Sequence, residues 1–179
     1  MRLETERLIL RPFEDRDRAP YAAFVADPEV RRFYPDTLDA DAANRMIDGW
    51  QVKLERNGFH YLAMERKADG VLVGDVGLAR MDYEIPGRPE VEMGWLVGRP
   101  YWGNGYAPEG ARACLDHAWQ VLGLNEVVAF TYRGNHPSRR VMEKIGMTRD
   151  PDGDFDHPLV PRGHRLRPHV LYRIANPLK

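Results

Sequence analysis

Residues 92–109 read Glu-Met-Gly-Trp-Leu-Val-Gly-Arg-Pro-Tyr-Trp-Gly-Asn-Gly-Tyr-Ala-Pro-Glu, the pattern of a strand, a glycine-bearing turn and the start of a helix. Gly103 and Gly105 carry no Cβ, so another molecule can approach the backbone closely there. A helix N-terminus just beyond them presents unpaired N–H groups and the positive end of the helix dipole. The segment therefore predicts an anion site, and the usual occupant of such a site is a phosphate.

The loop differs from the two commonest phosphate-binding loops. The chain contains no G-x-x-x-x-G-K-[ST] motif, which excludes a P-loop. Pro108 stands where the third glycine of G-x-G-x-x-G would fall. An alternative is a nucleotide-binding α/β protein that uses the same loop. A comparison of CoA binding with ATP and NAD binding would test it.

Residues 102–107, Trp-Gly-Asn-Gly-Tyr-Ala, resemble the acyl-CoA pyrophosphate loop of the GNAT acetyltransferases, which has the form [QR]-x-x-G-x-[GA] after a strand. The first position departs from the common Gln or Arg. The form Tyr-Trp-Gly-x-Gly-Tyr-Ala is typical of the branch that includes the ribosomal-protein N-terminal acetyltransferases.

Two further segments resemble the same branch. Residues 3–13 are similar to its opening strand, T-x-R-L-x-L-R. Residues 135–147 are similar to its helix N-x-x-S-x-x-v-x-E-K-x-G-F, with Met147 in place of Phe. The resemblance runs from Leu3 to about Gly146, and three motifs in the right order identify the family more specifically than any one of them.

The composition indicates one domain over residues 1–179. The 26 basic and 27 acidic residues give a formal net charge of −1, which argues against a protein that coats nucleic acid. A single cysteine, Cys114, cannot form an intramolecular disulfide. The N-terminus lacks an apolar secretion signal, and no apolar run is long enough for a membrane span. We therefore expect a cytoplasmic protein without a membrane partner; a homodimer is allowed.

Periodicity and turn residues predict an α/β fold. The resemblance implies the same fold, a single-domain GNAT-like structure with a mixed, mostly antiparallel twisted sheet flanked by helices. A strand, a helix and a strand between residues 90 and 132 imply two neighbouring parallel strands. We predict strands at 7–13, 59–66, 71–80, 90–97, 126–132 and 168–175, helices at 15–25, 39–56 and 137–145, and one more helix with Pro108 in its first turn and Gly123 at its end.

The resemblance also implies how acyl-CoA is bound. Its pantetheine amides are expected to pair with backbone groups of the strand near Trp95, Leu96 and Val97. Its pyrophosphate is expected to meet the amides of the loop, namely Gly103, Asn104, Gly105, Tyr106 and Ala107. Asn135 is a further candidate, either as a hydrogen-bond partner of the pantetheine arm or as the cap of its own helix.

Two residues are candidates for the chemistry. An amine acceptor must lose a proton, and Glu92 on the cofactor strand is the candidate base; the alternative is that it pairs with an Arg. Many family members have a tyrosine near the departing thiolate at the position that Met142 occupies here. Ser138 is therefore the candidate donor to the thiolate, and ordinary first-turn capping is its alternative role.

Other polar residues are given a structural role. Arg139, Arg140 and Lys144 are expected to form a solvated helix face, although they could instead reach the 3′-phosphate of the cofactor. Cys114 is expected to lie in the core. His157, His164 and His169 are not spaced like a compact zinc motif, so no metal is predicted. The acidic tract 150–158 is expected to be a solvated loop, although its carboxylates could instead attract a cationic amine, as could Tyr83 and Glu84.

The sequence thus predicts an N-acetyltransferase that moves acetyl from acetyl-CoA to a primary amine by direct attack in a ternary complex. The alternative is a non-catalytic module that senses acyl-CoA. The acceptor stays open among a protein N-terminus, a polyamine, an aminoglycoside and an amino-acid-like metabolite, because fold and cofactor site do not choose among them.

Overall fold

The computed structural model describes residues 1–87 and 89–179. Within them one sheet has the strand order β1-β2-β3-β4-β5-β6-β8-β7. All neighbours pair antiparallel except β5 and β6, which confirms the predicted mixed, mostly antiparallel sheet. The strands are β1 (Leu3–Glu4), β2 (Leu8–Arg11), β3 (Tyr61–Arg66), β4 (Val71–Arg80), β5 (Val91–Val97), β6 (Glu126–Tyr132), β7 (Thr148–Asp156) and β8 (Pro168–Ala175).

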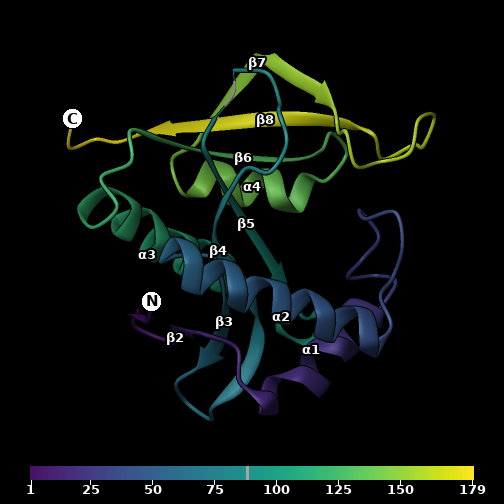
Figure 1. Ribbon diagram of the computed structural model, residues 1–179, viewed down its shortest axis with the longest axis vertical. Helices are drawn as coiled ribbons and strands as arrows, with labels where there is room; N and C mark the ends of the chain where they lie inside the picture. Colours follow the sequence, from purple (N-terminus) through teal and green to yellow (C-terminus); the bar gives the residue numbers. More distant parts are fainter. Residues whose placement is uncertain (88) are drawn as a thin grey trace.

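Helices cover both faces of this sheet (Figure 1). On one face, α1 (Asp15–Ala26) and α2 (Ala40–Asn57) pack through a cluster that includes Tyr21 and Ile47. On the other, α3 (Tyr106–Gln120) and α4 (His136–Lys144) pack through a larger cluster. The buried face of α3 carries Ala111, Cys114, Leu115 and Ala118, as its periodicity predicts. No helix of the described residues is long and apolar enough to cross a membrane.

Local sequence sets the ends of α2. Asp39 is the N-cap, and its Oδ1 accepts a hydrogen bond from the Ala42 N–H at 2.7 Å. Gly58 ends the helix in the left-handed conformation, with φ 80°. The ends of α2 agree closely with the helix predicted at 39–56. In α3 the helix ends at Gln120, before the predicted end at Gly123.

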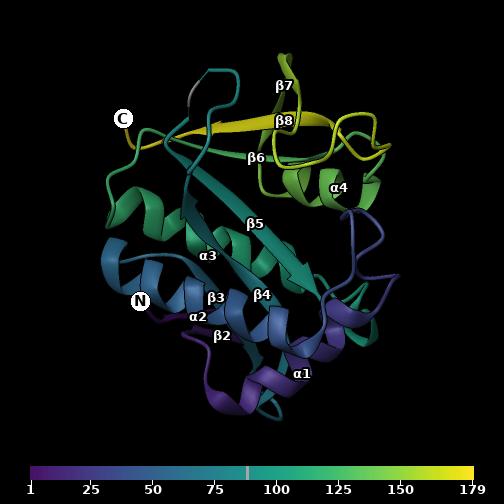
Figure 2. The same cartoon turned by 45° about the vertical axis from the view of Figure 1, so that its right-hand side comes forward.

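Strands β5 and β6 meet at one point only. Their parallel pairing is recorded at Glu92 and Val128, which confirms the predicted parallel neighbours. Beyond that pair the two strands separate: Figure 2 shows β5 descending obliquely while β6 and β8 run almost across the view. The C-terminal half of β5 is therefore left without a strand on that side, and backbone groups there remain available to a ligand.

One prediction about the C-terminal region is wrong. Residues 150–158 were expected to form a solvated loop, but most of them belong to β7. Pro151, Gly153 and the run of Asp are unfavourable in strands, which explains the error. β7 is tolerated because it is an edge strand whose pairing with β8 shifts register between Asp150 and Phe155.

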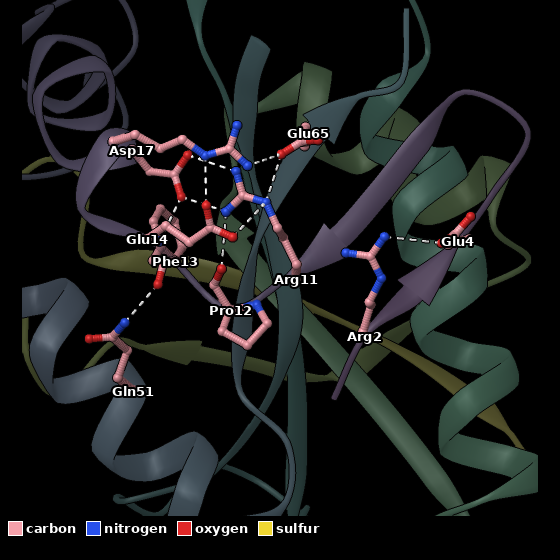
Figure 3. Close-up of polar contacts among 10 residues, drawn as sticks. Arg2, Glu4, Arg11, Pro12, Phe13, Glu14, Asp17, Gln51 and Glu65 are labelled. Atoms are coloured by element: carbon pink, nitrogen blue, oxygen red, sulfur yellow. Dashed lines mark hydrogen bonds and ion pairs between the residues drawn. The ribbon is translucent and has the colours of Figure 1, made fainter. Parts of the chain in front are cut away.

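The second arginine of the opening motif anchors α1. The Arg11 guanidinium is buried and donates to both carboxylate oxygens of Asp17, at 2.6 and 3.0 Å, and to Glu65 at 2.7 Å (Figure 3). A paired guanidinium can be buried because its donors are satisfied. The network fixes α1 against β2 and β3, and α1 leads directly into residues 29–34, which line the cavities described next.

Candidate functional site

The glycine loop leaves open space where a ligand can approach. Gly103 and Gly105 both have φ 79°, a conformation that other residues rarely adopt. A Cβ added at Gly103 would meet no atom within 4 Å, and one at Gly105 would meet only Arg7 Nη2, at 3.6 Å. The backbone conformation therefore demands glycine, while the protein itself does not fill the space above the loop. Gly105 is also the N-cap of α3.

Residues of the opening motif form hydrogen bonds with this loop and with the first turn of α3. Glu109, in the first turn of α3, accepts hydrogen bonds from Thr5 Oγ1 at 2.5 Å, from the Arg7 N–H at 2.9 Å and from Arg7 Nε at 2.7 Å. Arg7 Nη1 also donates to the Asn104 carbonyl at 3.0 Å. Partial burial raises the pKa of Glu109, but these hydrogen bonds outweigh it and hold the pKa below its usual value.

A cavity of about 420 Å³ lies beside the loop, and we call it the loop cavity. Its walls come from the end of β5, the glycine loop, the start of α3, the exposed side of α4 and residues 29–34. It brings together most of the predicted cofactor residues, namely Trp95, Leu96, Val97, Gly103, Gly105, Tyr106, Ala107 and Asn135. The exception is Asn104, which does not line it and donates to the carbonyls of Tyr101 and Trp102.

Basic side chains border the loop cavity on the α4 side. Arg140 and Lys144 line it and are exposed, so both can reach an anionic ligand. Arg139 points elsewhere: it donates to the Tyr172 hydroxyl at 3.2 Å and to the Arg133 carbonyl. The helix face is thus solvated as expected, but two of its three basic residues face the cavity.

The end of β5 is partly occupied by a side chain. The Trp102 indole N–H donates to the Val97 carbonyl at 2.7 Å. A carbonyl has two lone pairs, so Val97 can still accept a second hydrogen bond. The exposed edge of β5 beyond Glu92 can therefore pair with an extended amide-bearing ligand.

Asn135, and not Ser138, caps α4. The Asn135 Oδ1 accepts from the Ser138 N–H at 3.3 Å, and its Nδ2 donates to Thr131 Oγ1 at 2.9 Å and to Ser138 Oγ at 3.1 Å. The Ser138 hydroxyl therefore accepts from Asn135. Among the described residues its own proton has no acceptor, and it faces the loop cavity. The capping alternative for Ser138 is not what the structure shows.

Glu92 lies in a second cavity of about 560 Å³, which we call the Glu92 cavity. The Tyr61 hydroxyl donates to Glu92 Oε1 at 3.4 Å. No Lys or Arg of the described chain forms an ion pair with Glu92, so the expected alternative, a structural pair with Arg, is absent there. Burial raises the pKa of Glu92 to about 7, although the hydrogen bond from Tyr61 opposes the shift.

The two cavities meet. Five residues line both of them: Phe33, Tyr34, Trp95, Asn135 and Ser138. A group that enters along the glycine loop can therefore reach a group bound beside Glu92, with the Ser138 hydroxyl at the junction.

Comparison with known proteins agrees with this geometry. The model of the family described as Acetyltransferase (GNAT) domain matches residues 7–148. The chain belongs to the GNAT acetyltransferase family. The acetyl donor of this acetyltransferase is therefore acetyl-CoA.

Individual relatives share sequence and fold with it. YkkB of Bacillus subtilis, an uncharacterised protein, is 34% identical over 82% of this chain and 84% of its own length. A GNAT-family acetyltransferase structure from Bacillus anthracis has a TM-score of 0.81 and 27% identity, and the match covers 98% of this chain and 99% of that one. The ribosomal-protein-S5-alanine acetyltransferase of Vibrio fischeri shares the fold, with a TM-score of 0.74 at 16% identity over 99% of this chain and 97% of its own.

The C-terminal region contributes histidines to the candidate site, whereas the sequence suggested only that its carboxylates could attract an amine. The carboxylates of β7 do not reach into the cavity as a group; Asp150, Asp154 and Asp156 form ion pairs with arginines. His157 and His169 do line the Glu92 cavity. His157 follows directly after β7, so the position of this strand brings it to the cavity, but the unfavourable composition of β7 hides the strand in the sequence.

The two histidines have assignable tautomers. His157 Nδ1 accepts from the Leu159 N–H at 3.2 Å, so its Nε2 carries the proton and donates to the Tyr83 hydroxyl at 3.1 Å. His169 Nδ1 donates to the Arg167 carbonyl at 2.9 Å, which leaves its Nε2 as an acceptor. Burial lowers the pKa of His157 to about 4 and also lowers that of His169, so both are neutral at pH 7.

Cys114 lies outside both cavities. It is fully buried on the core-facing side of α3, as expected, and burial raises the pKa of its thiol to about 12. A thiol with such a pKa is a poor nucleophile at neutral pH. Among the described residues, no group of three or more His, Cys, Asp or Glu side chains could hold a metal ion.

Proposed function

We propose that this acetyltransferase transfers acetyl from acetyl-CoA to a primary amine by direct attack in a ternary complex. The observation that carries the proposal is the junction of the two cavities. The loop cavity suits the donor, because it offers a glycine loop, a helix N-terminus, a free strand edge and basic side chains. The Glu92 cavity suits the acceptor, because it holds a carboxylate that has no ion-pair partner in the part of the chain that the structure describes.

Glu92 is proposed to take the proton. Its pKa of about 7 keeps a substantial fraction ionised at neutral pH. A free α-amine has a pKa of about 7.7–8.0 and a lysine-type amine about 10.4, so an acceptor arrives mostly protonated. Only the neutral amine has the lone pair that attacks, so the ammonium first gives one proton to Glu92, which passes it to solvent. The nitrogen becomes far more acidic as it bonds to the carbonyl carbon. Its second proton then passes to the regenerated Glu92 carboxylate as the C–S bond breaks and its electron pair leaves with sulfur, and solvent carries a proton to the CoA thiolate.

Ser138 is proposed to stabilise the departing thiolate. Asn135 donates to its hydroxyl oxygen, which leaves the hydroxyl proton free for a group at the junction. Met142, at the position of the family's tyrosine, is buried and has no proton to donate. Ser138 is therefore the hydroxyl at the junction that can donate to developing negative charge on sulfur, an interaction that strengthens in the transition state.

The test is release of free thiol from acetyl-CoA by the purified protein with a mixed panel of primary amines. We expect amine-dependent thiol release and an acetylated amine in equal amounts. CoA binding measured by calorimetry on the same sample is the control. Tight CoA binding with no turnover for any amine would contradict the proposal and favour the acyl-CoA sensor.

A further inference from the structure

Two clusters of aromatic side chains line the Glu92 cavity from opposite sides of β5. Trp50 and Tyr61 come from α2 and β3, with ring centroids 5.0 Å apart. Tyr83 and Phe130 come from the segment before β5 and from β6, with centroids 6.5 Å apart. Because β3 and β6 lie on opposite sides of β5 in the sheet, Glu92 stands between the two clusters.

The charges around this cavity balance. Its lining holds two basic side chains, Lys53 and Arg80, and two carboxylates, Asp82 and Glu92. Lys53 and Asp82 form an ion pair with each other. The three lining histidines, His60, His157 and His169, are neutral at pH 7, because burial lowers the pKa of each. The cavity therefore presents one carboxylate without an ion-pair partner among the described residues, and aromatic rings next to it.

Several polar groups of the lining are satisfied by one another. His157 donates to Tyr83, and Asn135 donates to Thr131 and Ser138. The free groups include His60 Nδ1, which has no partner among the described residues, and His169 Nε2, which is left as an acceptor. Much of the rest of the wall is aromatic or aliphatic and includes Met46 and Leu159, so a ligand with many amide or hydroxyl groups would leave most of them unpaired here, which costs free energy for each buried group.

We infer that the acceptor is a small primary amine with a single positive charge and a flat aromatic group, rather than a polycation or a peptide N-terminus. The inference rests on the proposed function, because it assigns the occupant of the same site. The ammonium lies against Glu92, where aromatic faces add cation–π attraction. The ring lies among the aromatic side chains, and a cavity of this size holds a small ligand.

Other acceptor classes fit less well. A polyamine or an aminoglycoside brings several positive charges, but one unpaired carboxylate can neutralise only one of them. Burying the others beside Lys53 and Arg80 would be unfavourable. A peptide brings backbone amides that the lining does not pair.

A matched acceptor series tests the inference. Wild-type protein and acetyl-CoA are assayed by thiol release with 2-phenylethylamine, butylamine, spermidine, kanamycin and a short peptide with a free N-terminus. We expect 2-phenylethylamine to have a kcat/KM at least about tenfold above that of butylamine, equivalent to about 1.4 kcal/mol, and above every other member. Highest activity with spermidine, kanamycin or the peptide, or equal activity with the two simple amines, overturns the inference.

Two aromatic-to-leucine variants test which cavity is responsible for the preference for 2-phenylethylamine over butylamine. Phe130→Leu should reduce the ratio of the two kcat/KM values, because it removes a ring from the Glu92 cavity. Tyr101→Leu removes a ring from the loop cavity and should change both rates by the same factor, which leaves the ratio unchanged. Melting temperature verifies that each variant folds, and should Phe130→Leu fail to fold, Tyr83→Leu takes its place. An unchanged ratio in a folded variant of the Glu92 cavity contradicts the assigned site.

The outcomes distinguish failure of the proposed acetyl transfer from failure of the proposed acceptor class. If no amine in the series releases thiol although CoA binds, the proposed function fails. If amines are acetylated but the aromatic amine is not preferred, only the acceptor class is wrong.

Discussion

The loop cavity and the Glu92 cavity are adjacent but are built in different ways. About half of the residues that line the loop cavity come from one continuous stretch, residues 95–108, and much of its chemistry comes from backbone groups and glycine conformations. The Glu92 cavity is lined by side chains far apart in the sequence, from Phe33 to His169, which come from helices, strands and loops. A site made of backbone groups can be predicted from the local sequence, whereas a site made of side chains far apart in the chain cannot.

Loss of the carboxylate tests the Glu92 cavity most severely. Glu92→Gln keeps the side-chain shape but removes the base, and we expect kcat/KM to fall about 10²- to 10⁴-fold. The wild-type rate should rise as pH increases through about 7, because Glu92 must be ionised. The deficit of the variant should be largest between pH 7 and the pKa of the amine, and smaller above that pKa, where the amine arrives neutral.

Asp82→Asn is the matched control for that variant. Asp82 also lines the Glu92 cavity but is exposed and paired with Lys53, so its loss should change the rate little. pH–rate profiles of the two variants and of the wild type make the comparison. A Glu92→Gln profile that follows the wild type would assign the proton to another group or to water.

A smaller loss is expected at the junction of the cavities. Ser138→Ala should lower kcat in single-turnover acetyl transfer by about 10²-fold and leave CoA affinity nearly unchanged, because the hydroxyl acts on charge that develops only in the transition state. Stability should change little, since Asn135 supplies the helix cap. A variant that is destabilised but fully active would show that the serine has a structural role only.

The loop cavity is tested through glycine conformation. Gly105→Val places a β-branched residue at φ 79°, where it is strained, and we expect CoA affinity to fall at least about tenfold. Gly105→Asn is the matched variant, since Asn tolerates this conformation, and its loss should be smaller. Calorimetric titration with CoA measures both. Equal, undiminished affinity in the two folded variants would reject the loop as the phosphate site.

The smallest effect is expected on stability, from the ion pair between Arg7 and Glu109 beside the glycine loop. Glu109→Gln removes the charge that Thr5 and Arg7 hold, and the free energy of unfolding should fall by about 1 kcal/mol or less, because the Arg7 side chain is 45% exposed and water screens the pair. The folded-state pKa of Glu109 is lowered from 4.5, so this contribution is complete above that pH. It should be lost as pH falls through the lowered pKa. Urea unfolding at pH 7 and pH 3 measures the difference, and an equal gap at both would exclude the ion pair.

Much of the fold could be predicted from sequence. Asp39 and Gly58 mark the two ends of α2, and the glycine loop identifies the strand before it and the helix after it, because capping and positive φ depend on local residue type. β7 could not be predicted, because pairing with β8 at the sheet edge overrides its poor strand composition. The cap of α4 could not be predicted uniquely either. The sequence allowed Asn135 or Ser138 as the capping residue, and in the folded protein Asn135 caps the helix.

The sequence by itself determined the family, the sheet's parallel neighbours and the stretch of chain proposed to bind the donor, since each depends on residues close together in the chain. Only the tertiary structure decided that Thr5 and Arg7 hold Glu109, that Glu92 is half-buried without a basic partner among the described residues, and that His157 and His169 line the same cavity. The physical reason is that burial, pKa and side-chain contact depend on packed neighbours, and residues such as Tyr61 and His169 come to line one cavity only when the sheet assembles.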